Sequence, residues 1–297
     1  MTEPARRPRF PLALDRVAGA GAHKGGGRAG GHSGGHSGGQ GGASTGSPTG
    51  GQTLVRPQRP LQQAALDSAR QAPPSGLGMD SDAVRARMVQ RLRVDGITDE
   101  AVLAAFGAVL RHRFVDSALA TQAYEDTSLP IGLEQTISKP SVVARMLALL
   151  GETPSARERG SLGRVLEIGT GCGYQTALIA RMAKHVVSIE RLRPLHEKAR
   201  LNLDDGRGYQ RMRLLWGDGR AGHAPMAPYD SIVAAAGGED LPPAWLEQLA
   251  DGGRLVAPMQ EPGSRRQSLL VVDRQGDRYT RQRFEGVLFV PLKSGFE

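Results

Sequence analysis

A cluster of glycines that follows a carboxylate is the first feature of the chain that suggests chemistry. The stretch reads Glu167-Ile168-Gly169-Thr170-Gly171-Cys172-Gly173 and joins a hydrophobic run to an amphipathic one. A dinucleotide-binding turn has the pattern G-x-G-x-x-G, and here Tyr174 occupies the place of its third glycine. A P-loop is excluded because no Gly-Lys-Ser/Thr follows. The pattern that remains suits a ligand with positive charge.

S-adenosylmethionine is such a ligand, because it carries an ammonium and a sulfonium and has no phosphate. We expect Glu167 to face the ammonium. The glycines Gly169, Gly171 and Gly173 would let the backbone approach the methionine moiety. The N-terminus of the helix that follows would receive the carboxylate of the ligand.

Two further acidic residues follow later strands of the predicted sheet. Glu190 comes 21 residues after Gly169, where a carboxylate can accept both hydroxyls of a ribose. NAD enzymes share this spacing, so an NAD-dependent enzyme stays as an alternative. Asp218, followed by Gly219, is placed to bind the adenine amino group. Three acids at successive strand ends favour S-adenosylmethionine as the cofactor, with S-adenosylhomocysteine as the product.

Short apolar runs alternate with helical ones in the second half of the chain, which predicts the scaffold for these residues. Continuously apolar strands fit a parallel sheet that is buried on both faces. The alternation predicts an α/β, doubly wound, Rossmann-like fold, with a mostly parallel seven-stranded sheet, helices on both faces and ligands at the carboxyl ends of the strands. Because no helix separates the last two strands, we expect them to pair antiparallel. The predicted strands are 164–169, 185–190, 213–219, 230–237, 253–259, 268–274 and 284–292, with helices at 175–183, 192–204 and 242–250.

The segment before this core is predicted to be helical, with one long loop. Asp80 or Ser81 would cap a helix that runs to about Val94, and Thr98 or Asp99 would cap a second. The second helix covers 100–110, a third covers 141–150, a loop covers 127–140, and 151–163 is expected to be a surface linker.

Residues 1–78 differ in composition from the rest of the chain. Positions 19–51 hold 16 of the 40 glycines, and we expect a disordered tail because such a segment buries too little apolar surface. The tail holds nine of the 38 Lys and Arg and three of the 30 Asp and Glu, which leaves 29 basic and 27 acidic residues for the remainder. The basic charge of the protein is therefore mostly that of the tail. A solvating tail is favoured over one that binds nucleic acid, and His32 and His36 are not expected to hold a metal.

The remaining composition indicates the compartment. No run of apolar residues approaches the length of a membrane span. The apolar stretch near the N-terminus is too short for the core of a signal peptide. The single cysteine, Cys172, excludes an intrachain disulfide and fits a reducing compartment. We expect a cytoplasmic monomer without a metal site.

Five motifs in the same order resemble one known family, the protein-L-isoaspartate O-methyltransferases. They are LPIGLEQTISKP (129–140), VLEIGTGCGYQTALIA (165–180), VVSIER (186–191), GDG (217–219) and FVPL (289–292). The similarity runs from about Met88 to Leu292, and the first motif is the specific one, because the glycine motif marks a whole superfamily. Two departures are that Leu110-Arg111-His112-Arg113 replaces a Pro-Arg-Glu-like stretch and that Cys172 replaces a frequent serine.

The resemblance implies a methyltransferase domain at 79–297, with helices and a substrate loop at 79–163 and the cofactor-binding core and C-terminal strands at 164–297. The reaction of the family methylates the α-carboxylate of L-isoaspartyl residues in damaged proteins. The ester then closes to a succinimide, and hydrolysis restores part of the aspartate. Isoaspartyl proteins and peptides are therefore the expected substrates.

The resemblance also assigns the substrate residues. Ser138 matches the active-site serine of the family, Thr136 and Ile137 line the same pocket, and Val290 closes it from the C-terminal side. Without the resemblance, Ser138 would be interpreted as an N-cap of the helix at 141–150. Another S-adenosylmethionine-binding protein, tethered to nucleic acid or a partner by its tail, is the alternative function.

Overall fold

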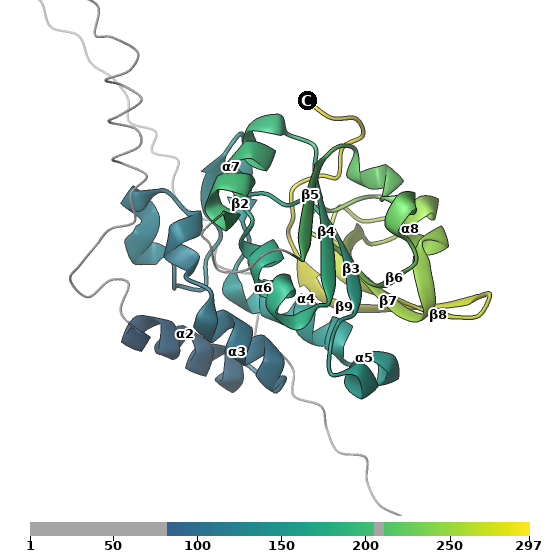
Figure 1. Cartoon of the computed structure of the whole chain (residues 1–297), viewed down its shortest axis with the longest axis horizontal. Coiled ribbons are helices and arrows are strands. Elements are labelled where there is room, and N and C mark those ends of the chain that lie inside the picture. Colours follow the sequence, from purple (N-terminus) through teal and green to yellow (C-terminus); the bar gives the residue numbers. More distant parts are fainter. Residues whose placement is uncertain (1–81, 205–210) are drawn as a thin grey trace, which may run out of the picture. The chain divides into compact units, whose positions relative to one another are not determined.

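A computed structural model describes residues 82–204 and 211–297, and the centre of this part is a seven-stranded sheet (Figure 1). The strand order is β5-β4-β3-β6-β7-β8-β9. Strands β3 to β7 are parallel, and β8 and β9 pair antiparallel, as expected. The strands are β3 (Arg164–Ile168), β4 (His185–Glu190), β5 (Met212–Trp216), β6 (Tyr229–Ala234), β7 (Leu249–Gln260), β8 (Gln267–Gln275) and β9 (Arg278–Val287). The predicted α/β fold is confirmed.

Both faces of the parallel strands are buried, because side chains of successive residues point to opposite faces. In β3, Val165 belongs to a hydrophobic core on one face and Leu166 to a second core on the other, and both are fully buried. This double burial explains why the strands are apolar without interruption.

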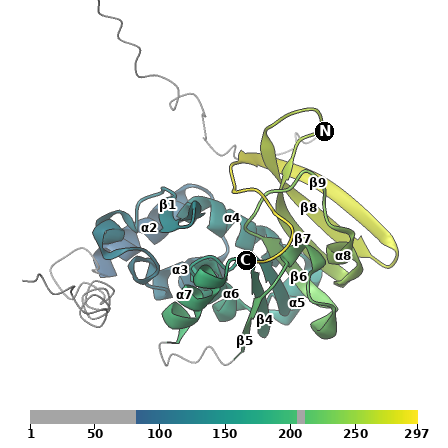
Figure 2. The same ribbon diagram turned by 90° about the horizontal axis from the view of Figure 1, so that it is seen from above.

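The helices that flank the glycine turn cover the first face. These are α4 (Pro140–Gly151), α6 (Tyr174–Met182) and α7 (Arg193–Leu203), and α8 (Pro243–Glu247) belongs to the second face. Figure 1 shows α6 and α7 on one side of the strands and α8 on the other. Trp245 of α8 donates from its indole nitrogen to the Gly219 carbonyl at 2.8 Å, so α8 also fixes the loop after β5. Figure 2 shows β8 and β9 as the long strands at one end of the sheet.

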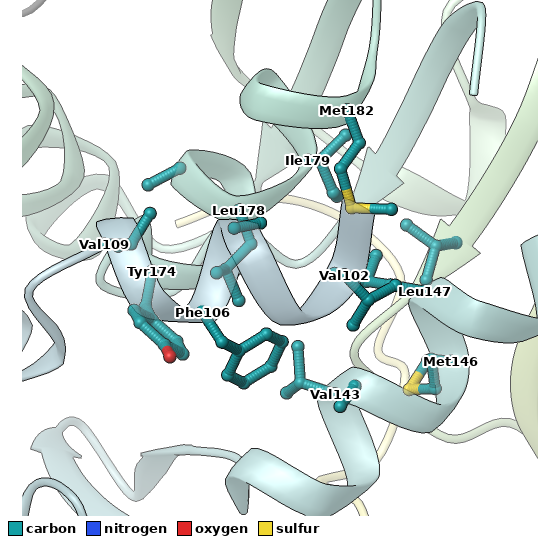
Figure 3. Close-up of a cluster of buried hydrophobic side chains, with 14 of the residues drawn as sticks. Val102, Phe106, Val109, Val143, Met146, Leu147, Tyr174, Leu178, Ile179 and Met182 are labelled. Atoms are coloured by element: carbon teal, nitrogen blue, oxygen red, sulfur yellow. The ribbon is translucent and has the colours of Figure 1, made fainter. Parts of the chain in front are cut away.

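Two N-terminal helices, α2 (Asp82–Val94) and α3 (Glu100–Ala108), join the first core. Asp99 caps α3, since its side chain accepts hydrogen bonds from two amides of the first turn. Figure 3 shows Phe106 of α3 among side chains of α4 and α6. The rings of Phe106 and Tyr174 meet edge to face at 6.1 Å, which anchors the start of α6 against α3.

Three local expectations were wrong. Residues 151–163 are not only a linker, since Thr153 caps a short helix, α5 (Pro154–Arg159), that ends at a left-handed Gly160. The expected loop at 127–140 contains a hairpin of β1 (Leu129–Gly132) and β2 (Gln135–Ile137). The last strand ends at Val287, so the segment 288–292 leaves the sheet.

The boundary expected near residue 78 and the tail before it lie outside the described residues, as do the capping residues Asp80 and Ser81 and the histidines His32 and His36.

The start of α6 requires glycine at position 173, and this gives a prediction for stability. Gly173 has φ = 90°, and a Cβ there would lie 2.9 Å from Cδ1 of Leu203 on α7. Gly173→Ala should therefore lower the free energy of unfolding by about 2 kcal/mol, measured by chemical denaturation. Gly132→Ala is the control, because Gly132 has φ = 99° and no atom within 4 Å of the added carbon. The control should lose only about 1 kcal/mol from backbone strain. Equal losses would contradict crowding against α7.

Candidate active site

One cavity lies at the carboxyl ends of β3, β4 and β6, and we call it the strand-end pocket. Its cavity volume is about 160 Å³, and it opens to solvent. Its walls come from the glycine turn after β3, the end of β4, the loop after β6, the hairpin end at 134–138 and the C-terminal segment at 290–293. The pocket therefore joins the predicted cofactor half to the predicted substrate half.

Most of the residues predicted from the sequence line this pocket. Those that line it are Thr136, Ile137, Ser138, Gly169, Gly171, Glu190, Gly219 and Val290. Three others do not line it, namely Glu167, Gly173 and Asp218.

All three glycines of the turn have a left-handed backbone. Gly169, Gly171 and Gly173 have φ of 89°, 57° and 90°, which disfavours other residues. A Cβ on Gly171 would lie 3.3 Å from Cδ1 of Ile131, which belongs to the hairpin. Glycine thus lets the hairpin and the turn approach each other across the pocket.

Glu190 ties the glycine turn to the end of β4. Its Oε2 accepts a hydrogen bond from the Gly171 amide at 2.8 Å, and its Oε1 accepts one from the Leu192 amide at 3.0 Å. The residue is 5% exposed and lines the pocket. A carboxylate oxygen accepts more than one hydrogen bond, so both oxygens still have capacity for hydroxyl donors of a ligand.

Glu167 lies beneath the turn and is fully buried. Its Oε2 accepts hydrogen bonds from the hydroxyls of Thr176 at 2.5 Å and Ser188 at 2.6 Å. Its Oε1 has no partner among the described residues. Burial raises the pKa of Glu167 to about 7, while the Ser188 and Thr176 hydroxyls favour the charged form and oppose this rise.

The hydroxyls around Glu167 were not predicted from the sequence. The Ser188 hydroxyl also lies 2.6 Å from that of Thr170, which lines the pocket. The sequence held a partial signal, because Ser188 interrupts an otherwise apolar stretch of β4. These hydroxyls connect the pocket to the buried carboxylate.

Asp218 lies beside the C-terminal segment. Its Oδ1 accepts from the Arg220 amide at 2.8 Å, and its Oδ2 accepts from the Gly295 amide at 2.6 Å. Next to it, the rings of Phe296 and Trp216 meet edge to face at 5.1 Å. Asp218 therefore holds the loop that presents Gly219 to the pocket.

Ser138 precedes α4 but does not cap it. The N-cap position is Lys139, whose side chain makes no capping hydrogen bond. Asp126 supplies the cap instead, since its carboxylate accepts from the Ser141 amide at 2.9 Å and from the Ser141 hydroxyl at 2.8 Å. No hydrogen bond to the Ser138 hydroxyl is found within the described residues, and the residue is half-buried and lines the pocket. Ser138 is thus free to contact a ligand.

Backbone pairing holds the C-terminal wall of the pocket. The Gly237 amide donates to the Val290 carbonyl at 2.8 Å, and the Leu292 amide donates to the Gly237 carbonyl at 2.6 Å. Val290 therefore faces the pocket from a segment fixed to the loop after β6.

Within residues 82–204 and 211–297, no group of three or more His, Cys, Asp or Glu side chains is arranged to hold a metal ion. Over the same ranges, no helix has the length and apolar character to cross a membrane. Cys172 is a buried free thiol whose pKa is raised by burial, and we assign it no role.

The chain is similar to a family and to relatives with a named activity. The family model for Protein-L-isoaspartate(D-aspartate) O-methyltransferase matches residues 83–297. A protein-L-isoaspartate O-methyltransferase of Methylibium petroleiphilum is 54% identical over 289 residues, which cover 97% of this chain and 96% of the relative. One of Leptothrix cholodnii is 59% identical over 241 residues, covering 81% of this chain and 84% of the relative. The first alignment therefore extends into the N-terminal segment that the family model leaves out.

Solved structures agree with these relatives. One protein-L-isoaspartate O-methyltransferase aligns with a TM-score of 0.63 at 28% identity, covering 71% of this chain and 67% of that chain. A second, described as a putative enzyme of this kind from Plasmodium falciparum in complex with S-adenosyl-L-homocysteine, gives a TM-score of 0.60 at 23% identity. It covers 70% of this chain and 98% of that chain, and it supports the fold alone.

The buried carboxyl beneath the turn gives a prediction for pH dependence. Because folding raises the pKa of Glu167 to about 7, the folded state binds more protons than the unfolded state between its unfolded pKa of about 4 and that value. The free energy of unfolding should fall by about 3 kcal/mol as pH rises from about 4 to about 8. Glu167→Gln should remove this part of the slope, measured by urea denaturation across that range. Glu197→Gln, at an exposed position on α7, should keep the wild-type slope. An unchanged slope in Glu167→Gln would contradict the assignment.

Proposed function

This chain belongs to the protein-L-isoaspartate(D-aspartate) O-methyltransferase family, and from that premise we propose how its own residues perform the reaction. It transfers a methyl group from S-adenosylmethionine to the α-carboxylate of L-isoaspartyl residues in damaged proteins. The observation that carries the residue assignment is the strand-end pocket, which places Glu190 and the glycine turn in the same cavity as Ser138.

The cofactor half of the pocket fits S-adenosylmethionine. Glu190 is the acceptor for the ribose hydroxyls, because backbone amides fix both of its oxygens and the residue lines the cavity. Gly169 and Gly171 leave space beside the turn for the methionine moiety. The start of α6 has no side-chain cap, so its free amides can receive the ligand carboxylate.

The three predicted cofactor residues outside the pocket act indirectly in this proposal. Glu167 favours the ammonium from beneath the turn, as a buried carboxyl connected through hydroxyls to Thr170. Gly173 lets α6 approach α7. Asp218 holds Gly219 at the adenine end, because its two oxygens accept the Arg220 and Gly295 amides.

The substrate half of the pocket fits a carboxylate. A carboxylate is ionised at neutral pH, since its reference pKa is about 4, so the reaction needs no general base. S-adenosylmethionine supplies an electrophilic methyl group on its sulfonium. Ser138 donates its hydroxyl to one carboxylate oxygen and thereby orients the other oxygen toward that methyl group. The rate enhancement then comes mostly from aligning the carboxylate oxygen with the sulfonium methyl group in a site that excludes water.

The peptide around the damaged residue lies along the hairpin and the C-terminal wall. Thr136 is exposed at the mouth of the pocket, Ile137 is buried beneath it, and Val290 lies in the opposite wall. The released ester closes to a succinimide without help from the protein, and hydrolysis returns part of the damaged residue to aspartate. We also propose that the protein acts in the cytoplasm as a monomer, and its single free cysteine fits a reducing compartment.

The substrate specificity is tested with two synthetic peptides that differ only at one residue, isoaspartyl in one and aspartyl in the other. With labelled S-adenosylmethionine, we expect base-labile methyl incorporation into the isoaspartyl peptide only. Equal labelling of both peptides would reject the specificity. Labelling of neither would favour the alternative of a cofactor-binding protein with another role.

The role of Ser138 predicts a selective kinetic defect. Ser138→Ala should lower kcat/KM for the isoaspartyl peptide about tenfold to a hundredfold, because a hydrogen bond to a charged group is lost. The dissociation constant of S-adenosylhomocysteine, measured by calorimetry, should stay at the wild-type value. Ser128→Ala is the matched control, since Ser128 is exposed and does not line the pocket. A changed dissociation constant of S-adenosylhomocysteine together with an unchanged kcat/KM would contradict this role.

The role of Glu190 predicts the opposite pattern. Glu190→Gln should weaken S-adenosylhomocysteine binding about tenfold or more, since it removes a charged acceptor from the ribose end of the site. Glu197→Gln, the same change at an exposed helix position, should leave the affinity unchanged. Unchanged affinity in Glu190→Gln would show that the ribose is bound elsewhere.

A further inference from the structure

A buried cation lies directly behind the substrate half of the strand-end pocket. Arg111 begins the 3₁₀ turn Arg111–Phe114 and has 0% exposure, which is rare for an arginine. Burial lowers its pKa, but a guanidinium remains charged at any physiological pH. Burying this charge is costly, so its surroundings indicate what it does.

The partners of Arg111 belong to the substrate loop and to α6. Its Nη2 donates to the Ser138 carbonyl at 2.8 Å and to the Thr127 carbonyl at 3.4 Å. Its Cζ lies 4.8 Å from the centre of the Tyr174 ring, and that ring lines the pocket. Arg111 does not line the pocket itself, so it contacts the site through Ser138 and Tyr174.

The charge of Arg111 is only partly compensated. Within the described ranges, Arg111 forms no ion pair with a carboxylate, and its Nε and Nη1 have no hydrogen-bond partner. Burial raises the pKa of the Tyr174 hydroxyl, so the tyrosine stays neutral. Asp126 is a carboxylate that acts on this charge from nearby, and Arg111 contacts Ser138 at the end of the pocket where the proposed substrate is an anion.

The turn that carries Ser138 is fixed from two sides. Arg111 holds the Ser138 carbonyl, and Asp126 holds the amide and hydroxyl of Ser141. Between them, Lys139 precedes Pro140, which disfavours a helical backbone at Lys139, and Lys139 has φ = −53° and ψ = 140°. Because the Ser138 hydroxyl has no hydrogen bond of its own within the described residues, this backbone frame determines where it lies and which rotamers it can adopt.

We propose that Arg111 is a positioning residue for methyl transfer. It orients the Ser138 hydroxyl through the Ser138 carbonyl, and its buried charge favours the substrate carboxylate. This inference rests on the proposed function, and it separates two effects that act on different kinetic constants. Orientation acts on kcat, and charge acts on KM for the isoaspartyl peptide.

The test compares Arg111→Lys and Arg111→Met with the wild-type enzyme. Lysine keeps the charge but lacks the planar fork that bonds two carbonyls and stacks on the ring, so kcat should fall about tenfold while KM stays near the wild-type value. Methionine removes both features, so kcat should fall and KM should rise. Replacement of a buried ionic group by an apolar one is often tolerated, so the fold should persist. In both variants the dissociation constant of S-adenosylhomocysteine should be unchanged.

The controls keep this inference distinct from the proposed function. Arg87→Met, at an exposed position of α2, should leave all three constants unchanged. An inactive wild-type enzyme would reject the proposed function, whereas an active wild type with unchanged kcat in both variants would overturn the role of Arg111 alone. A loss of cofactor affinity parallel to the loss of kcat would also overturn it, because it would indicate general damage. Should Arg111→Met fail to fold, the kcat and KM of Arg111→Lys decide the question.

Discussion

The carboxylate of Glu190 is the interaction on which the rest of the site depends. It accepts one amide from the glycine turn after β3 and one from its own loop after β4, so it fixes two neighbouring strand ends to each other. A parallel sheet brings such ends to one edge but leaves their loops free to diverge. With this carboxylate in place, the glycine turn is held in one conformation and forms the floor of the pocket. Glycine is needed in the turn because the turn lies close to Ile131 of the hairpin.

The substrate half is attached to this floor through the hydrophobic core and not through the sheet. Tyr174 is the shared residue, because it starts α6, packs against Phe106 of α3 and lies under the guanidinium of Arg111. The helices before the core therefore have a functional consequence, since they fix the distance between the glycine turn and Ser138. The carboxylate of Glu190 on one side and the buried guanidinium of Arg111 on the other, both bonded to backbone groups, fix the two halves of the pocket.

The sequence predicted what depends on local pattern. Continuous apolar runs indicated the strands, and the acid at the end of one of them indicated Glu190. The sequence did not predict α5, because this helix is too short to show the periodic spacing of apolar residues that marks a helix. Its two ends were nevertheless encoded, with Thr153 as the N-cap and Gly160 as the left-handed C-cap. The roles of Asp126 and Arg111 depend on contacts 15 and 27 residues away in the chain, which no spacing rule encodes. Asp218 and Glu167 were recognised as acids at strand ends, but only the structure distinguishes acids that face the pocket from acids that support it.

A structure of the enzyme with S-adenosylhomocysteine and an isoaspartyl peptide tests the central claim most directly. The account predicts ribose hydroxyls on the Glu190 carboxylate and the isoaspartyl carboxylate on the Ser138 hydroxyl, in one continuous cavity. It also predicts that a carboxylate oxygen lies close to the sulfur, separated by about the space of one methyl group. Density for the ribose away from Glu190, or a Ser138 hydroxyl that points away from the peptide, would contradict it.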